Sequence, residues 1–212
     1  MYDTVIFDLD GTLLNTLDDL YEGVNNAMLI CGFPLKTKDE VRLAVGNGAR
    51  KLIQRCMPGG AENRLEECLT VFQAEYSKCK EHRTAPFPLA LRTLSALKEK
   101  GIKVAVVSNK PEFAVKALCD KWFKGLVDVA VGDDGVRRLK PYPEAIEYAL
   151  SQLNSKKENA FYVGDQEVDV ESARNAGLML VGAGWGFRGK QTLLLAGAEI
   201  VCASPWDIMD LL

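Results

Sequence analysis

The sequence predicts an α/β fold, in which a doubly wound, mostly parallel, Rossmann-like sheet carries an inserted helical cap. Short apolar runs rich in branched residues recur along the chain, and helical patterns separate most of them. Such alternation is typical of parallel sheets that are covered by helices. The exception is a stretch of about 70 residues after the first apolar run, which contains no convincing strand.

Five apolar runs lack polar alternation and therefore predict buried strands: residues 4–9, 103–107, 127–131, 160–163 and 178–181. Residues 199–202 are a sixth candidate strand. Helices between these runs are indicated by leucines at helical spacing before Gly101 and by Pro111 at a helix start. Near the end, Ser204 and Pro205 resemble the N-cap and first residue of a short final helix.

The strandless stretch, residues 15–85, predicts a helical cap inserted into a core of residues 1–14 and 86–212. Two candidate capping boxes mark helix starts: Thr16 with Asp19, and Thr37 with Glu40. Apolar residues and cysteines at helical spacing after Gly59 and Gly60 predict a long helix, and their stripe is typical of a packed core. Prolines at positions 86 and 88 stiffen the return to the core domain.

Composition limits the classes of function. The 212 residues are 48% hydrophobic, which is enough to fill a sizeable core, and the formal charge of -3 gives no basic field for nucleic acid or an anionic membrane. Six scattered cysteines without a CxxC pair favour reduced thiols in a cytoplasmic protein and disfavour a zinc site. No apolar run approaches the roughly 20 residues of a membrane span. The sequence leaves the oligomeric state open.

Two carboxylates, Asp8 and Asp10, end the first predicted strand within the segment Asp8-Leu9-Asp10-Gly11-Thr12. Residues two apart on a strand point to one face, where like charges without compensation repel each other and lose hydration. The arrangement therefore favours a bound cation or a shared proton. A solvated turn at the end of a strand is the alternative, because Asp and Gly are common in turns.

Asp165 follows the apolar run 160–163 and is expected at the same carboxyl edge of the sheet, where ligands of open α/β sheets bind. Asp169 lies one helical turn later and faces the same side. Four carboxylates are thus expected to converge. Hard oxygen ligands of this kind suit Mg²⁺, which binds one or two carboxylates together with waters and substrate phosphate.

Two further strand ends offer groups that a phosphate would need. Ser108 and Asn109 follow the strand of residues 103–107 and precede a predicted helix, whose N-terminus favours anions. Lys140 precedes another predicted helix and supplies an ammonium group. Taken separately, Ser108 could simply cap a helix and Lys140 could simply be solvated.

Together these segments resemble the haloacid dehalogenase superfamily of phosphatases: DxDGT at residues 8–12, Ser108, KPxPE at 140–144 and GDxxxD at 164–169. The resemblance implies that Asp8 attacks phosphorus, while Asp10 protonates the leaving oxygen and then activates water. It implies that Ser108 and Lys140 hold the phosphoryl group, with Thr12 and Asn109 as further phosphate-binding candidates. Asp8, Asp165 and the backbone carbonyl of Asp10 would bind Mg²⁺, and Asp169 would orient Lys140 or a metal-bound water.

The glycine pattern at residues 184–189 also fits the GxGxxG dinucleotide fingerprint. The helix that could follow it is short, and no acidic residue ends a strand about 20 residues later, as ribose binding would require. We therefore interpret the segment as a loop beside the site. The sequence Trp-Gly-x-Arg within it also resembles this phosphatase family.

Within the family, the loop Gly46-Asn47-Gly48-Ala49-Arg50 resembles that of phosphoglycolate phosphatases, and Asn47 and Arg50 become candidates for substrate binding. We expect a small anionic phosphorylated metabolite, 2-phosphoglycolate, as substrate. A glycine-rich turn between helices is the structural alternative.

The alternative enzymes are a pyrophosphatase, a sugar-phosphate phosphatase, a phosphomutase and a phosphonatase, the last with Lys51 as Schiff-base candidate. A catalytically silent regulatory module is the alternative outside enzymes. Asn15, Gln166 and residues 86–89 depart from the usual family pattern, which puts substrate details in doubt rather than the reaction.

Overall fold

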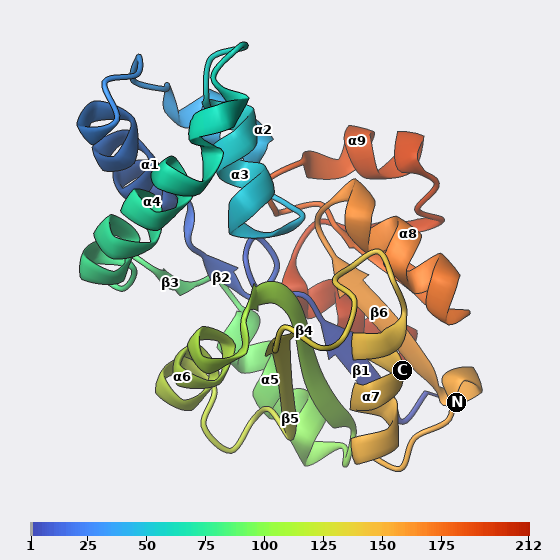
Figure 1. The fold of residues 1–212 in the computed structure, drawn as a ribbon. Helices are drawn as coiled ribbons and strands as arrows, with labels where there is room; N and C mark the ends of the chain where they lie inside the picture. Colours follow the sequence, from blue (N-terminus) through green and yellow to red (C-terminus); the bar gives the residue numbers. More distant parts are fainter. Residues whose placement is uncertain (1) are drawn as a thin grey trace. The chain divides into compact units, whose positions relative to one another are not determined.

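The structure is a computed structural model that describes residues 2–212, and the chain divides into two compact units (Figure 1). The larger one, here called the core unit, comprises Met1–Leu14 and Pro86–Leu212. The smaller one, the helical unit, comprises Asn15–Ala85. Where the chain passes between the two units, β2 (Leu14–Asn15) pairs with β3 (Ala85–Pro86). Whether the helical unit acts as a cap stays a prediction.

A six-stranded sheet with the order β5-β4-β1-β6-β7-β8 forms the centre of the core unit. Each neighbouring pair of strands is parallel. The predicted α/β fold is therefore confirmed, and the sixth candidate strand is present. The strands are β1 (Thr4–Phe7), β4 (Lys103–Pro111), β5 (Val129–Asp133), β6 (Ala160–Gly164), β7 (Met179–Ala183) and β8 (Ile200–Cys202).

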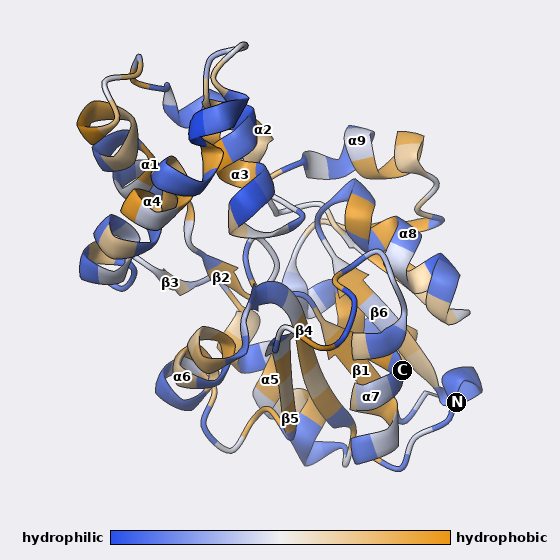
Figure 2. Ribbon diagram, in the orientation of Figure 1, coloured by the Kyte–Doolittle hydropathy of each residue, from blue (hydrophilic) through white to orange (hydrophobic). Residues whose placement is uncertain are grey.

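Helices cover both faces of this sheet. Alternate residues of β1 point to opposite faces, so that Val5 and Phe7 join one buried cluster and Ile6 joins the other. The first cluster packs against α5 (Ala90–Glu99), α6 (Glu112–Trp122) and the 3₁₀ helix η3 (Pro205–Leu211). The second packs against α7 (Glu144–Gln152), α8 (Glu167–Ala176) and α9 (Gly189–Ala196). The short 3₁₀ helix η2 (Lys157–Asn159) precedes β6. The hydropathy colouring shows the sheet as predominantly apolar (Figure 2).

The topology brings three loops to one edge of the sheet. From β1 the chain crosses to β4 and β5 on one side, and it later crosses back to β6 on the other side. The strand order thus reverses at β1, and such a switch point leaves a ligand-binding crevice beyond the carboxyl ends of the strands. The segments that follow β1, β4 and β6 all lie at this edge.

The helical unit consists of helices only, apart from the residues of β2 and β3 at its boundary: α1 (Leu17–Ile30), α2 (Lys38–Ala44), α3 (Gly48–Cys56), the 3₁₀ helix η1 (Glu62–Arg64) and α4 (Leu65–Cys79). The predicted capping box at Thr37 is confirmed, because the Thr37 hydroxyl accepts the Glu40 N–H and the Glu40 carboxylate accepts the Thr37 N–H. The predicted long helix is α4, whose buried residues include Cys68 and Phe72.

The capping box predicted at Thr16 is wrong. The Thr16 side chain makes no capping hydrogen bond. Asp19 is fully buried, and its carboxylate accepts the backbone N–H groups of Arg83 and Thr84, each at 2.9 Å, and the Thr84 hydroxyl at 2.7 Å. Asp19 therefore binds Arg83 and Thr84, more than 60 positions away, instead of the start of its own helix. Without Asp19, the buried Thr84 donors would lack these hydrogen bonds.

The cysteines and the apolar segments of the chain can be compared with the expectations from composition. All six cysteines are buried, and none of them forms a disulfide. Within residues 2–212, no helix combines the length and the apolar character that crossing a membrane would need.

Candidate active site

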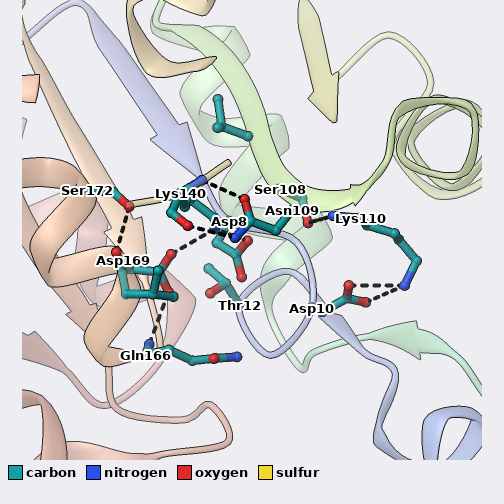
Figure 3. Close-up of polar contacts among 12 residues, drawn as sticks. Asp8, Asp10, Thr12, Ser108, Asn109, Lys110, Lys140, Gln166, Asp169 and Ser172 are labelled. Atoms are coloured by element: carbon teal, nitrogen blue, oxygen red, sulfur yellow. Dashed lines mark hydrogen bonds and ion pairs between the residues drawn. The ribbon is translucent and has the colours of Figure 1, made fainter. Parts of the chain in front are cut away.

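Asp8 lies at the carboxyl end of β1 and is almost fully buried. Its backbone N–H still bonds to the Val163 carbonyl of β6, which fixes the chain at the sheet edge. The Asp8 carboxylate accepts the Lys140 ammonium at 2.6 Å, and Lys140 also donates to Asp169 at 2.8 Å (Figure 3). The hydroxyl of Tyr162 on β6 lies 3.0 Å from the same ammonium. One lysine thus bridges the strand-end aspartate and the helix α8 aspartate.

Asp165 follows β6 and is fully buried. Its carboxylate accepts the Thr12 hydroxyl at 3.3 Å and the Phe187 N–H at 2.8 Å. Two glycines leave room for it: a Cβ on Gly11 would lie 2.4 Å from the Asp165 carboxylate, and a Cβ on Gly186 would lie 2.3 Å from the Asp165 Cβ. The segment that resembles a dinucleotide fingerprint thus packs beside the carboxylate site, as its sequence interpretation requires.

Asp8, Asp165 and Asp169 form a group in which one carboxylate oxygen from each residue lies within 4.8 Å of the other two. Burial, opposed by the Lys140 charge, raises the pKa of Asp8 to about 7. Burial and the neighbouring Asp169 and Asp8 charges raise the pKa of Asp165 well above its usual value. Buried carboxylates this close need a compensating cation, and their hard oxygens fit Mg²⁺. The residues present therefore fit the expected metal.

Lys140 stays charged within this group. Burial by itself would lower the pKa of its ammonium, but the Asp169 and Asp8 charges outweigh burial and raise that pKa. The Lys140 backbone is fixed as well, because the Asn109 side-chain amide donates to its carbonyl at 3.1 Å and accepts its N–H at 2.7 Å. The Asn109 side chain, expected at a phosphate, is thus placed against the Lys140 backbone.

Asp10 does not join the carboxylate group. Its two carboxylate oxygens lie 3.1 and 3.0 Å from the ammonium of Lys110 on β4. Figure 3 shows this pair apart from the group of Asp8, Lys140 and Asp169. The expected convergence of four carboxylate side chains is therefore wrong for Asp10, because a lysine 100 positions away attracts it. The metal role predicted for Asp10 concerns its backbone carbonyl and is not affected.

Ser108, Asn109 and Lys110 occupy an irregular part of β4. The register with β5 runs from Val107 opposite Val131 to Pro111 opposite Asp133, so that these three residues face the single residue Gly132. Such a bulge redirects side chains at the end of a strand. Ser108 is buried, and its hydroxyl oxygen accepts the Lys110 N–H at 3.3 Å.

The two substrate candidates of the helical unit are engaged within that unit. Arg50 is an exposed residue of α3 and forms an ion pair with Glu66 of α4. Asn47 is the N-cap of α3 with a left-handed φ of 61°, and its side-chain oxygen accepts a hydrogen bond from Arg55 at 2.9 Å. Their role toward a substrate stays a prediction.

Sequence reasoning missed three contributors to this site: Lys110, Tyr162 and the Phe187 N–H. A count of charges could have indicated Lys110, because four expected carboxylates with Lys140 alone leave a large negative excess. Tyr162 lies inside an apolar run, where its hydroxyl gives no signal of its own. The Phe187 amide is a backbone group, which only the fold can place.

A sequence profile of the haloacid dehalogenase-like hydrolase family matches residues 5–183. The chain belongs to this family. Phosphoglycolate phosphatase of Pseudomonas putida is 33% identical over 97% of this chain and 75% of its own length. The enzyme of that name from Aquifex aeolicus is 34% identical over 86% of this chain and 85% of its own length.

Solved structures agree with these relatives. A crystal structure from Lactobacillus delbrueckii subsp. bulgaricus, whose protein carries a provisional phosphoglycolate phosphatase name, superposes with a TM-score of 0.95. It is 28% identical, and the alignment covers 99% of this chain and 98% of that one. The resemblance inferred from the sequence is confirmed, and the chain is a phosphatase of this family.

Proposed function

We propose that this enzyme hydrolyses a small phosphate monoester with Mg²⁺, through a covalent aspartyl-phosphate on Asp8, in the cytoplasm. The observation that carries the proposal is the buried contact of Lys140 with both Asp8 and Asp169, next to Asp165. A purely structural ion pair would balance its charges, whereas three buried carboxylates around one lysine leave a place for a divalent cation and an anionic substrate.

Asp8 is the proposed nucleophile. Its Oδ attacks phosphorus, an Asp8 O–P bond forms, and the bond from phosphorus to the leaving oxygen breaks. Lys140 orients Asp8 and neutralises charge on the phosphoryl oxygens, and Ser108 lies at the neighbouring strand end as a further hydrogen-bond donor. The Thr12 hydroxyl donates to Asp165 and its backbone N–H donates to the Leu9 carbonyl, each at 3.3 Å, so its proposed phosphate contact would replace one of these two bonds.

Asp8, Asp165 and the Asp10 backbone carbonyl are the proposed ligands of Mg²⁺. The ion, when bound, supplies positive charge to the phosphoryl oxygens. Asp169 already contacts Lys140 and accepts the Gln166 N–H at 3.0 Å, which favours orientation of Lys140 as its task.

Asp10 is the proposed general acid and base. It gives a proton to the leaving oxygen in the first step and takes a proton from the water that attacks the aspartyl-phosphate in the second. The second step releases inorganic phosphate and regenerates the Asp8 carboxylate. Asp10→Asn should therefore slow both steps, by about 10² to 10⁴-fold. Rapid-quench measurement of the phosphorylated enzyme would resolve them, and an unchanged second step would contradict the base role.

A small phosphorylated carboxylate, 2-phosphoglycolate, is the proposed substrate. Two similar curated enzymes carry the name of that activity, and Arg50 offers a planar guanidinium that suits a carboxylate. To bind the substrate carboxylate, Arg50 would have to break its ion pair with Glu66. Because this ion pair is exposed, breaking it costs little.

The deciding experiment compares kcat/KM for 2-phosphoglycolate, glucose phosphates and pyrophosphate, with and without Mg²⁺. We expect 2-phosphoglycolate to be preferred and chelation to abolish turnover. A preference for either other substrate would favour the sugar-phosphate phosphatase or pyrophosphatase alternatives. Absence of any Mg²⁺-dependent turnover would favour a silent module instead.

A further inference from the structure

Lys110 is a nearly buried lysine in the core unit to which no step of the proposed reaction assigns a task. Its side chain is 7% exposed, and the side chain of its partner Asp10 is 16% exposed. The ammonium lies 3.0 to 3.1 Å from both carboxylate oxygens of Asp10, so one cation contacts both oxygens. Both charges have lost most of their water, and each therefore depends on the other for compensation.

The bulge of β4 positions this lysine. Lys110 lies in the segment that faces Gly132 of β5, and a Cβ on Gly132 would come within 2.7 Å of the Lys110 carbonyl and 2.5 Å of the Glu112 Cα. A glycine there allows the close approach of the two strands. The Lys110 backbone is further held by its N–H bond to the Ser108 hydroxyl. The lysine is therefore built into the strand end rather than carried on a surface loop.

The Lys110 contact decides the direction of the Asp10 side chain. Figure 3 shows Asp10 turned toward Lys110, whereas Asp8 is turned toward Lys140. With Lys110 included, four carboxylates face two ammonium groups, and the remaining two negative charges equal the charge of one divalent cation. Without Lys110, Asp10 would be a partly buried carboxylate beside three others, and their repulsion would act on its orientation.

We propose that Lys110 is a positioning residue, which holds the Asp10 carboxylate apart from Asp8 in the orientation from which Asp10 exchanges protons with the leaving group and with water. The inference rests on the proposed acid and base role of Asp10. The Lys110 ammonium contacts the Asp10 side chain, whose proposed task is proton transfer, so removal of this ammonium should affect proton transfer more than the binding of substrate and metal.

The leaving group provides a readout that a merely structural role would not change. An aryl phosphate has a leaving group that departs without a proton, whereas an alkyl phosphate needs one. Lys110→Met should lower kcat/KM for an alkyl phosphate by about tenfold or more, within the range of general acid catalysis, and should lower it much less for an aryl phosphate. KM and the Mg²⁺ concentration for half-maximal rate should change by less than about threefold, and Lys110→Arg should restore part of the rate.

Lys116→Met is the matched control, because Lys116 pairs with Glu112 on the exposed surface of α6 and should tolerate the same substitution without a kinetic change. A double-mutant cycle completes the test. In an Asp10→Asn background, Lys110→Met should cost no further alkyl-phosphate activity, because the group that it positions is gone.

Three outcomes would overturn the inference: equal losses for aryl and alkyl phosphates, a raised KM at unchanged kcat, or a further loss in the Asp10→Asn background. If Lys110→Met does not fold, Lys110→Arg and Lys110→Gln answer the same leaving-group question. If Asp10→Asn itself retains full activity, the proposed function of Asp10 fails. If Asp10→Asn is impaired and the Lys110 variants behave as wild type, only the present inference fails.

Discussion

The ion pair of Lys140 with Asp169 at the sheet edge of the core unit differs in burial from the ion pair of Arg50 with Glu66 in the helical unit. In the core unit the side chains of Lys140 and Asp169 are 4% and 1% exposed, whereas in the helical unit those of Arg50 and Glu66 are 57% and 69% exposed. Buried charges cost desolvation and persist only where other groups compensate them, while exposed pairs contribute little. The buried charges of Lys140 and Asp169 are therefore held in one arrangement, whereas the exposed pair of Arg50 and Glu66 can change partners at small cost.

The largest expected effect comes from the buried nucleophile. Asp8→Asn should lower turnover of an aryl phosphate by at least about a thousandfold, because the amide keeps the shape of the side chain but cannot attack phosphorus. It also removes one of three repelling carboxylates, so the metal-free variant should melt at or above the wild-type temperature. Calorimetry together with the phosphatase assay checks both parts, and wild-type activity would disprove the assignment of the nucleophile.

Metal removal tests whether the carboxylate group needs a cation. Exhaustive chelation should abolish turnover, and added Mg²⁺ should raise the melting temperature, by the equivalent of about 2.7 kcal/mol at a hundredfold excess over its dissociation constant. Asp165→Asn should lose most of this stabilisation. Glu66→Gln, which removes an exposed carboxylate, should keep it. An equal stabilisation of both variants would place the metal elsewhere.

Close packing around Asp165 gives an intermediate effect. Gly186→Ala places a Cβ 2.3 Å from the Asp165 Cβ and 2.5 Å from the Gly11 carbonyl, and such overpacking costs about 1–3 kcal/mol of the free energy of unfolding. The shifted carboxylate should also raise the Mg²⁺ concentration for half-maximal activity. Gly59→Ala is the control, since no atom lies within 4 Å of the Cβ that it adds. Wild-type metal dependence in Gly186→Ala would contradict the account.

Arg50 should give the smallest effect on stability and the sharpest effect on substrate choice. Because its ion pair with Glu66 is exposed, Arg50→Met should shift the melting temperature by no more than about 2 °C. The proposed carboxylate contact predicts a lower kcat/KM for 2-phosphoglycolate, with no change for an aryl phosphate that lacks a carboxylate. An equal change for both substrates would remove Arg50 from substrate recognition.

The sheet and the edge that carries the site can be predicted from the amino-acid sequence. Apolar runs separated by helical patterns are local signals, and parallel connections bring the carboxyl ends of the strands together. The sequence therefore predicts that Asp8, Ser108 and Asp165 lie at one edge of the sheet. The resemblance of the four motif segments to the phosphatase family followed from the same local signals, and their order along the chain supported it.

The partner that each charged side chain takes depends on the folded chain and cannot be predicted from the sequence. Asp10 contacts Lys110, a hundred positions away, instead of the carboxylate group, and Asp19 binds the returning segment at Thr84 instead of capping its own helix start. Both outcomes have the same physical reason. A buried charge is stabilised by whichever opposite charge or donor the fold brings within hydrogen-bond distance, and spacing along the sequence does not contain that information.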